Sequence, residues 1–320
     1  MTATTPSPIH ATPPAARRAA LHRTLLAWYG HQRRDLPWRR TRDPYAILVA
    51  EVMLQQTQVD RVLPRYHEFL ARFPTLAALA AASPADVIRC WSGLGYNVRA
   101  VRLHQVARRI VTEYGGQFPR SLPALLALPG LGPYTARAVA CFAFEDHVPV
   151  VDTNVRRVLG RVLRDTVGQA AGERFFLALA EAVLPPGHAY EWNQALMDLG
   201  ATICTARKPL CLLCPLSQHC DALRSGAPIE QPGGNGRSSG NGQPFVGSTR
   251  YYRGRILAAL RAVGSDQALD LPTLGRALKA DFGPADLSWL RGLLYGLERD
   301  GLVVLTGKGG GDGEGVRLPH

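Results

Sequence analysis

Two carboxylic acids in different surroundings are the first candidates for chemistry. Glu51 is the only polar residue in the apolar stretch AILVAEVML at 46–54. A buried carboxylate is costly unless it is paired or used, so Glu51 either faces water or is a desolvated acid suited to donating a proton. Asp152 precedes an expected helix, where amide donors and the helix dipole keep a carboxylate ionised. The pair predicts a general acid and a stabiliser of a sugar cation.

Four of the six cysteines fall in the pattern C-x6-C-x2-C-x5-C, formed by Cys204, Cys211, Cys214 and Cys220. A secreted disulfide framework would spread its cysteines, so a reduced compartment with a thiolate-bound metal is the better interpretation. The first gap fits a structural zinc site poorly, whereas a cubane iron-sulfur cluster accepts four thiolates from uneven loops. Zinc stays open as an alternative from the ligand type alone.

A glycine-rich turn, LPGLGPYTA at 128–136, is expected between two helices. Gly130 and Gly132 allow close backbone approach, and Pro133 suits a first helical position. Amides at a helix start bind phosphate oxygens. An ordinary helix-helix loop is the alternative. The formal net charge of +12 favours a contact with the backbone of DNA.

The elements that must position these residues are mainly helices. Apolar residues at three- and four-residue spacing dominate from 21 to 225, and residues 1–20 are expected to be a disordered tail. The Gly-, Ser- and Asn-rich stretch 226–247 predicts a flexible linker. Residues 248–320 give the order helix, helix, helix, strand, which predicts a small winged-helix-like unit. No apolar run approaches the ~20 residues of a membrane span.

These elements, in this order, resemble the helix-hairpin-helix DNA glycosylase superfamily with a terminal [4Fe-4S] loop, and most closely the adenine DNA glycosylases of the MutY type. The similarity runs from about Leu36 to Cys220, and EVMLQQTQ at 51–58 and GLGY at 93–96 carry it together with the turn and the cysteines. The resemblance implies a monofunctional base excision repair enzyme. Its reaction would hydrolyse the N-glycosidic bond of adenine mispaired with 8-oxoguanine or guanine.

The resemblance also implies a role for each matching residue. Glu51 would protonate N7 of adenine and Asp152 would stabilise the oxocarbenium sugar, with Tyr134 and Asn154 positioning the site. The adenine pocket would be formed by Leu36, Trp38, Arg39 and Gln194. The residues expected to contact DNA around the extruded base are Gln55, Gln56, Thr57, Leu94, Tyr96, Gly130 and Gly132. The four cysteines would hold the [4Fe-4S] cluster.

The chain departs from the family pattern at two places. Thr153 stands where many members have glycine, and the linker with its short C-terminal unit replaces the long domain that inspects 8-oxoguanine. A bifunctional lyase needs an amine nucleophile, but the corresponding position in the turn is Tyr134. Two alternatives remain, a T:G mismatch thymine glycosylase and a non-catalytic iron-sulfur DNA-binding regulator. We expect a monomeric, cytoplasmic bacterial protein that binds double-stranded DNA containing mispaired adenine, with no membrane partner.

Overall fold

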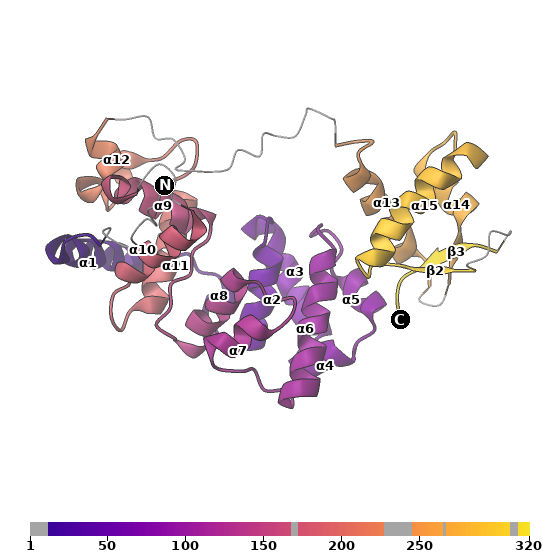
Figure 1. The fold of residues 1–320 in the computed structure, drawn as a ribbon, viewed down its shortest axis with the longest axis horizontal. Helices are drawn as coiled ribbons and strands as arrows, with labels where there is room; N and C mark the ends of the chain where they lie inside the picture. The colour runs from indigo at the N-terminus through magenta and orange to yellow at the C-terminus, as the bar shows by residue number, and fades with distance from the viewer. Residues whose placement is uncertain (1–11, 168–171, 227–244, 265–266, 308–312) are drawn as a thin grey trace, which may run out of the picture. The chain divides into compact units, whose positions relative to one another are not determined.

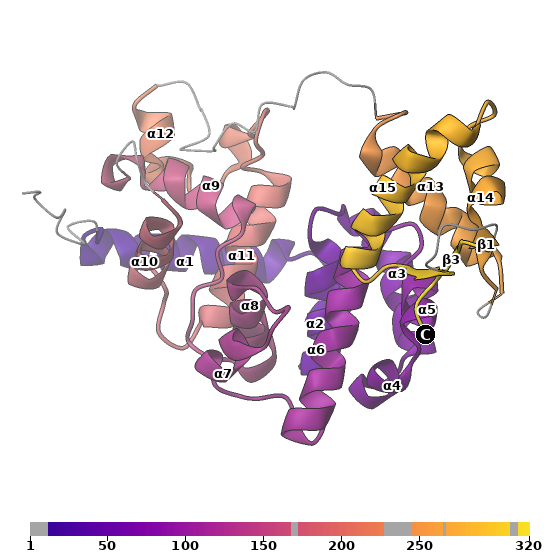
Figure 2. The same ribbon diagram turned by 45° about the vertical axis from the view of Figure 1, so that its right-hand side comes forward.

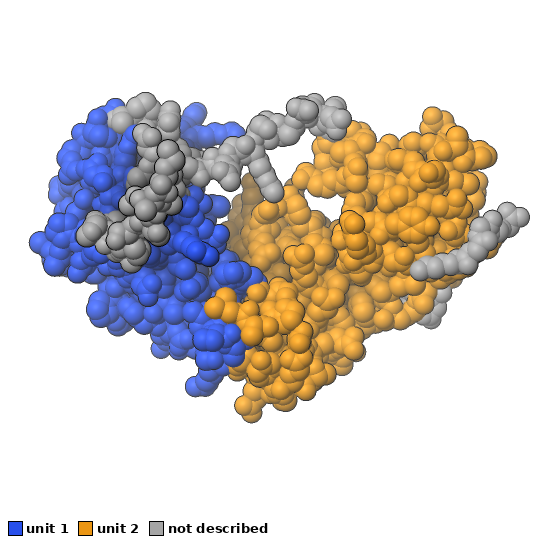
Figure 3. Space-filling model, in the orientation of Figure 1, with its two compact units in different colours: residues 1–47, 120–125, 132–237 blue, residues 48–119, 126–131, 238–320 orange. Residues whose placement is uncertain are grey.

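The computed structural model describes residues 12–167, 172–226, 245–264, 267–307 and 313–320. Helices dominate these residues, so the expectation of a mainly α protein is confirmed. They form two compact units, coloured blue and orange in Figure 3. The first unit draws on residues 1–47, 120–125 and 132–237, and the second on residues 48–119, 126–131 and 238–320. Among the described residues, no helix has the length and apolar character needed to cross a membrane.

The first unit is a helical bundle built around α11 (Ala189–Thr202). This helix packs against α1 (Ala15–Gln32), α8 (Pro133–Phe144) and α9 (Thr153–Val162), as Figures 1 and 2 show. Its residues from Trp192 to Gly200 are all buried, as expected for a helix covered on every side. The other elements of this unit are α10 (Glu173–Ala182), α12 (Asp221–Arg224) and the 3-10 turns Pro37–Arg39, Arg164–Thr166, Cys211–Leu213 and Ser217–His219.

The N-terminal helix α1 begins earlier than the sequence predicts. Its first residue is Ala15, so residues 15–20 belong to the folded unit and the expected tail 1–20 is too long. Arg17 explains the difference, because its Nη2 lies 2.5 Å from Asp221 Oδ1 and donates to the Val162 carbonyl at 2.9 Å. Asp221 is fully buried, so this ion pair fixes the start of α1 against α12. Residues 1–11 lie outside the described part of the chain.

The helices α3 (Val59–Arg72), α4 (Leu76–Ala81), α5 (Pro84–Cys90) and α6 (Val98–Tyr114) belong to the second unit. The longest of them, α6, packs on α4 and α5 and ends at Gly115, whose φ of +61° is the left-handed conformation that glycine adopts most readily. Phe69 packs edge to face on Trp91 at 5.8 Å between ring centroids. Two helices cross between the units, α2 (Pro44–Leu54) and α7 (Leu122–Ala127).

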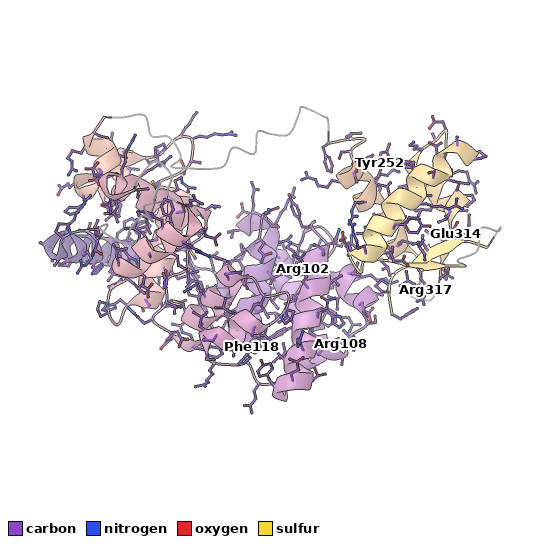
Figure 4. The ribbon with its side chains drawn as sticks, viewed as in Figure 1. Arg102, Arg108, Phe118, Tyr252, Glu314 and Arg317 are labelled. Carbon is purple, nitrogen blue, oxygen red and sulfur yellow. The ribbon has the colours of Figure 1, made fainter. Side chains whose placement is uncertain are left out.

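The C-terminal elements contain the three predicted helices and the predicted strand, and they add a short strand between the first two helices and another at the end. They are α13 (Thr249–Ala262), β1 (Leu269–Asp270), α14 (Leu271–Leu278), the 3-10 turn Pro284–Asp286, α15 (Leu287–Arg299), β2 (Val304–Thr306) and β3 (Gly315–Arg317). The strands form an antiparallel sheet of order β1-β3-β2, in which Val316 pairs with Leu269 on one side and Leu305 on the other. Tyr252 of α13 packs edge to face on Trp289 of α15, and Glu314 accepts from Arg291. Figure 4 labels Tyr252 on α13 and Glu314 near the sheet.

These C-terminal elements share one apolar core with α5 and α6. Ile88 of α5 and Val101 of α6 are buried in the same cluster as Leu260, Leu294 and other side chains of the C-terminal helices. Arg261 of α13 adds a hydrogen bond to the Ile88 carbonyl at 3.0 Å. The compact units therefore differ from the expected domains 21–225 and 248–320, because apolar packing joins residues that the linker separates in sequence. Most of that linker, residues 227–244, lies outside the described residues.

Candidate active site

The candidate site residues are divided between the two units, and each set is described within its own unit. The first unit holds Asp152, Asn154, Tyr134, Gln194, the segment 36–39 and the four cysteines. The second unit holds Glu51, Gln55, Gln56, Thr57, Leu94, Tyr96 and Gly130. Gly132 lies in the first unit, at the end of the turn that crosses between them.

Glu51 lies on α2, a helix whose start is fixed by Asp43. The Asp43 carboxylate accepts from the backbone N–H groups of Tyr45 at 3.0 Å and Ala46 at 3.3 Å. Glu51 itself is buried, with 6% of its surface exposed, and so are its neighbours Ala50 and Val52. The alternative in which Glu51 faces water is therefore wrong. A carboxyl group kept from bulk water in this way is suited to proton transfer.

Asp152 caps the N-terminus of α9, as its position in the sequence suggests. Its Oδ1 accepts from the Val155 N–H at 2.7 Å, and its Oδ2 accepts from Asn154 Nδ2 at 2.9 Å. Burial raises the pKa of Asp152 from its ordinary value, and the hydrogen bonds from Val155 and Asn154 oppose this shift without cancelling it. The expectation that capping keeps this carboxyl on the ionised side is thus wrong in direction, because desolvation outweighs the cap.

Arg157 fixes the amide of Asn154 through the amide oxygen, while the amide nitrogen bonds Asp152. Arg157 Nη2 donates to Asn154 Oδ1 at 2.7 Å and to the Gly200 carbonyl at 2.6 Å, while its Nε donates to the Cys204 carbonyl at 2.8 Å. One guanidinium therefore connects the Asp152 cap, the central helix α11 and the first cysteine of the C-x6-C-x2-C-x5-C loop. Arg157 was not predicted from the sequence, although it follows Asn154 by one helical turn.

The segment leading to Asp152 is fixed by Asn193, which the sequence analysis also missed. Asn193 is buried on α11, where its Oδ1 accepts from the Val150 N–H at 2.9 Å and its Nδ2 donates to the Val148 carbonyl at 3.0 Å. An amide can satisfy a donor and an acceptor of one backbone segment in this way. The neighbouring Gln194, predicted to contact the base, is buried on the same helix with 5% exposure.

Leu36 and Trp38 are buried, and the neighbouring Arg39 is half-buried and engaged in an ion pair. Arg39 donates through both terminal nitrogens to Asp198, at 2.7 and 2.8 Å. Arg34 Nε reaches the same carboxylate at 2.6 Å. Burial acts to raise the pKa of the fully buried Asp198, but the hydrogen bond from Arg39 and the charges of Arg39 and Arg34 outweigh it, so the pKa is lowered. Arg39 therefore positions this segment against α11.

The glycine-rich turn joins α7 to α8 as a helix-hairpin-helix element. Gly130 has a φ of +94°, and an added Cβ would lie 3.3 Å from Val106 Cγ2. Gly132 precedes α8 and has open space where a Cβ would point, while Pro133 occupies the first helical turn. Tyr134 is half-buried at the start of α8. Such a turn exposes backbone N–H groups at a helix start, which suits a phosphate oxygen.

Two adjacent loops of the second unit present Gln56 and Tyr96 in strained conformations. Gln56 has a φ of +56° and Tyr96 a φ of +44°, values that residues other than glycine rarely adopt. Gln55 and Gln56 are exposed, Thr57 is half-buried, and Tyr96 is 46% exposed. Leu94, by contrast, is buried, so it contributes packing and a backbone carbonyl.

Arg99 holds these two loops together. Its Nη1 donates to the Val52 and Met53 carbonyls at 2.8 and 2.9 Å, at the end of α2. Its Nη2 donates to Thr57 Oγ1 at 3.0 Å and to the Gly95 carbonyl at 3.1 Å. Burial lowers the pKa of Arg99 to about 10. Arg99 was not predicted from the sequence, because its role depends on carbonyl groups from two separate segments.

The four cysteines line one cavity of the first unit together with apolar side chains from α9 and α11. They form no disulfide, and Arg161 Nη1 approaches Cys204 Sγ at 3.4 Å. Within the described residues, no three His, Cys, Asp or Glu side chains converge as ligands of a single metal ion. Four free thiols around a shared apolar cavity fit a multi-atom cluster better than one zinc ion. The residues present therefore fit a [4Fe-4S] cluster.

Comparison with known protein families agrees with this geometry. Residues 49–173 match the HhH-GPD superfamily base excision DNA repair proteins. Residues 204–220 match the iron-sulfur binding domain of endonuclease III. The fold and the site thus define a helix-hairpin-helix base excision DNA repair protein that carries an iron-sulfur loop.

Individual relatives narrow the class. The chain is 49% identical over 239 residues to the adenine DNA glycosylase of Mycolicibacterium smegmatis. This match covers 74% of this chain and 79% of the relative. It is 43% identical over 219 residues to the human adenine DNA glycosylase, covering 65% of this chain and 40% of the relative. The chain belongs to the adenine DNA glycosylase family.

Solved structures share the fold. A thermostable thymine-DNA glycosylase matches with a TM-score of 0.60 and 33% identity, covering 66% of this chain and 98% of that chain. An endonuclease III trapped in a covalent complex with DNA matches with a TM-score of 0.57 and 22% identity, covering 65% of this chain and 98% of that one. Neither family match extends into the C-terminal elements after residue 220.

Proposed function

We propose that this protein is a monofunctional adenine DNA glycosylase that hydrolyses the N-glycosidic bond of adenine mispaired with 8-oxoguanine or guanine. The observation that carries the proposal is a buried acid on α2, Glu51, in the same chain as a helix-capping acid on α9, Asp152, whose carboxylate is bonded by Asn154. Membership of the adenine DNA glycosylase family supports adenine as the base. The thymine alternative rests on a relative of lower identity.

In the proposed reaction Glu51 donates its proton to N7 of adenine. Protonation makes the base a better leaving group, so the bond between the sugar C1′ and N9 breaks and its electron pair leaves with the base. The sugar becomes an oxocarbenium ion, which the Asp152 carboxylate stabilises. Water then adds to C1′ and loses a proton. Asn154 and Tyr134 position these groups, while Leu36, Trp38, Arg39 and Gln194 form the adenine pocket.

The remaining site residues are proposed to bind double-stranded DNA. The turn with Gly130 and Gly132 would hold a backbone phosphate, and Gln56 and Tyr96 would fill the space left when the adenine is extruded. Gln55, Thr57 and Leu94 would lie beside them. The four cysteines would hold the [4Fe-4S] cluster, which would brace their loop. The exposed Arg207 and Lys208 of that loop are available to phosphates.

The reaction should stop at an abasic site. A lyase step needs an amine that forms a Schiff base with the sugar, and the first lysine of the chain is Lys208, within the cysteine loop. Tyr134 cannot supply that amine. We place this monofunctional enzyme as a monomer in the bacterial cytoplasm, where its DNA substrate is found.

A cleavage panel tests the proposal. Duplexes containing A or T opposite guanine, 8-oxoguanine or cytosine are incubated with excess full-length protein, and strands are resolved with and without alkali. We expect alkali-dependent cleavage at A opposite 8-oxoguanine or guanine, and no product with Glu51→Gln. Cleavage at T opposite guanine instead would establish the thymine alternative. DNA binding without any base release would support a non-catalytic regulator.

A further inference from the structure

A groove of about 680 Å³ lies within the second unit, where the Gln56 and Tyr96 loops meet the C-terminal elements. One wall consists of residues 56–58 and 93–98, and the other is supplied by Phe245, α13 and the end of α15. Phe245 and Arg250 lie outside both family matches. The groove is thus composite, with one wall from the glycosylase fold and one from the winged-helix-like elements.

The charge of this groove is strongly positive. Its lining includes four arginines and one acidic residue, Asp300, which pairs with Arg253. Arg261 is half-buried and donates to the Asn97 amide oxygen at 2.7 Å, and desolvation lowers its pKa. Among the described residues, Arg61 and Arg250 form no salt bridge with a carboxylate, and Arg250 instead contacts the Tyr96 hydroxyl. An anion that enters the groove therefore meets positive charge that the protein itself does not balance.

Aromatic side chains border these cations. Arg250 Nη1 lies 3.2 Å from the Tyr96 hydroxyl, and its guanidinium lies 5.1 Å from the centre of the Phe245 ring. Tyr96 is 46% exposed and Phe245 is 55% exposed. Large aromatic rings left open to solvent beside arginines form a stacking surface with a phosphate site next to it.

We propose that this groove binds an unstacked nucleotide of the DNA substrate, with Arg250 contacting its phosphate and Phe245 stacking on its base. A nucleotide combines one negative charge with a flat π-face, and the groove offers a cation and a ring within one side-chain length of each other. The proposal rests on the proposed function in one respect, that DNA is the substrate. It assigns DNA-binding residues to the C-terminal elements, which join the glycosylase fold through the Ile88 and Val101 core.

Equilibrium binding of the full-length protein tests the groove. The probe is a duplex with a tetrahydrofuran abasic analogue in place of the adenine nucleotide, so no bond is cut during titration. Phe245→Ala should weaken binding roughly five- to hundredfold, the range expected for one stacked base, and Phe245→Tyr should restore it. Arg250→Ala should lower the log-log salt slope by about one, the value for a single lost phosphate contact.

The matched control is Arg276→Ala, which removes the same charge from an exposed position on α14 outside the groove lining. It should leave affinity and salt slope unchanged. The proposal is overturned if Phe245→Ala binds as tightly as wild type, if Arg250→Ala keeps the full slope, or if Arg276→Ala loses as much slope. If an acidic protein segment occupies the groove instead of DNA, Phe245→Ala should bind the duplex as tightly as wild type and Arg250→Ala should keep the full salt slope.

The test separates failure of the groove from failure of the proposed function. Base release is measured separately, in single turnover at saturating protein on a duplex with adenine opposite guanine. Absence of adenine release by the wild type, together with weaker probe binding by both groove variants, would reject the glycosylase and retain the groove. Normal adenine release by the wild type, together with unchanged probe binding by both groove variants, would retain the glycosylase and reject the groove. Thermal unfolding checks that both exposed-residue variants are folded.

Discussion

Gly200 of α11 lies so close to Asn154 of α9 that an added Cβ would approach Asn154 Cβ at 2.6 Å. The Gly200 carbonyl and the Asn154 amide oxygen are also both bonded by Arg157. The position of the Asp152 cap therefore depends on residue 200 of another helix being a glycine, which has no side chain. Substitutions at this contact separate the positioning of the site from general helix stability.

Gly200→Ala should impair base release and destabilise the protein. The new methyl group has no space, and forced overpacking of this kind costs about 1–3 kcal/mol. Gly292→Ala on α15 is the control, since nothing lies within 4 Å of its Cβ position and alanine favours a helix by about 0.5–1 kcal/mol. Thermal unfolding and single-turnover rates measure both. Full activity in Gly200→Ala would show that α9 tolerates a shift.

Asp152→Asn should abolish base release and destabilise the protein less than Asp152→Ala, although it loses the bond from Asn154. Asparagine remains a good helix cap, so the bond from the Val155 N–H is kept, while the buried charge is removed. A neutral amide cannot stabilise the sugar cation equally. Asp152→Ala, which also loses the cap, should cost about 1 kcal/mol of stability. Equal destabilisation by both variants would contradict this account.

The stability of Asp152→Asn relative to wild type should depend on pH, and burial of Asp152 sets the sign of this dependence. The pKa of Asp152 is higher in the folded protein than its ordinary value, so the contribution of this carboxyl to stability is greatest at acidic pH and is lost as pH rises through the folded pKa. Asparagine does not titrate. The melting temperature of Asp152→Asn relative to wild type should therefore increase from acidic to neutral pH. Activity of the wild type should rise over the same interval, because the ionised carboxylate is required.

Arg99→Lys should loosen the Gln56 and Tyr96 loops. A single ammonium cannot replace the fork that serves carbonyls of both segments, and each buried carbonyl left unsatisfied costs about 1–3 kcal/mol. Arg102→Lys is the control, because Arg102 is exposed on the same helix (Figure 4). Denaturant unfolding should show a loss only for Arg99→Lys, together with weaker binding to the abasic duplex. Wild-type stability would mean that lysine satisfies both segments.

Removal of residues 227–320 should destabilise the second unit, because it exposes Ile88, which is fully buried in the shared core. Ile88→Ala supplies a quantitative check. In the full-length chain it should cost about 2–5 kcal/mol, and in the truncated chain distinctly less, because the surrounding side chains are gone. Urea unfolding of the full-length and truncated chains, each with Ile88 and with alanine at that position, gives the coupling free energy between Ile88 and the C-terminal elements. Equal costs in both backgrounds would mean that the C-terminal elements do not cover Ile88.

Local chemistry in the sequence was sufficient to predict several features. The Asp152 cap, the Gly130 turn and the cysteine spacing each depend on residues close together in the chain, so their types and spacing indicate their roles. Helix bounds such as Val98–Tyr114 follow from apolar periodicity and a terminal glycine. The burial of Glu51 remained an alternative, because a helix pattern does not say what covers each face.

Contacts across long separations were decided by the tertiary structure alone. Arg99 bonds carbonyls more than forty residues away, Arg39 pairs with Asp198, and Gly200 admits Asn154. None of these partners is marked by local spacing, since each depends on how helices pack. The direction of the Asp152 pKa shift was mispredicted for the same reason, because desolvation depends on all surrounding atoms whereas a cap depends on three residues. The sequence therefore determined which groups could react, and packing determined their surroundings.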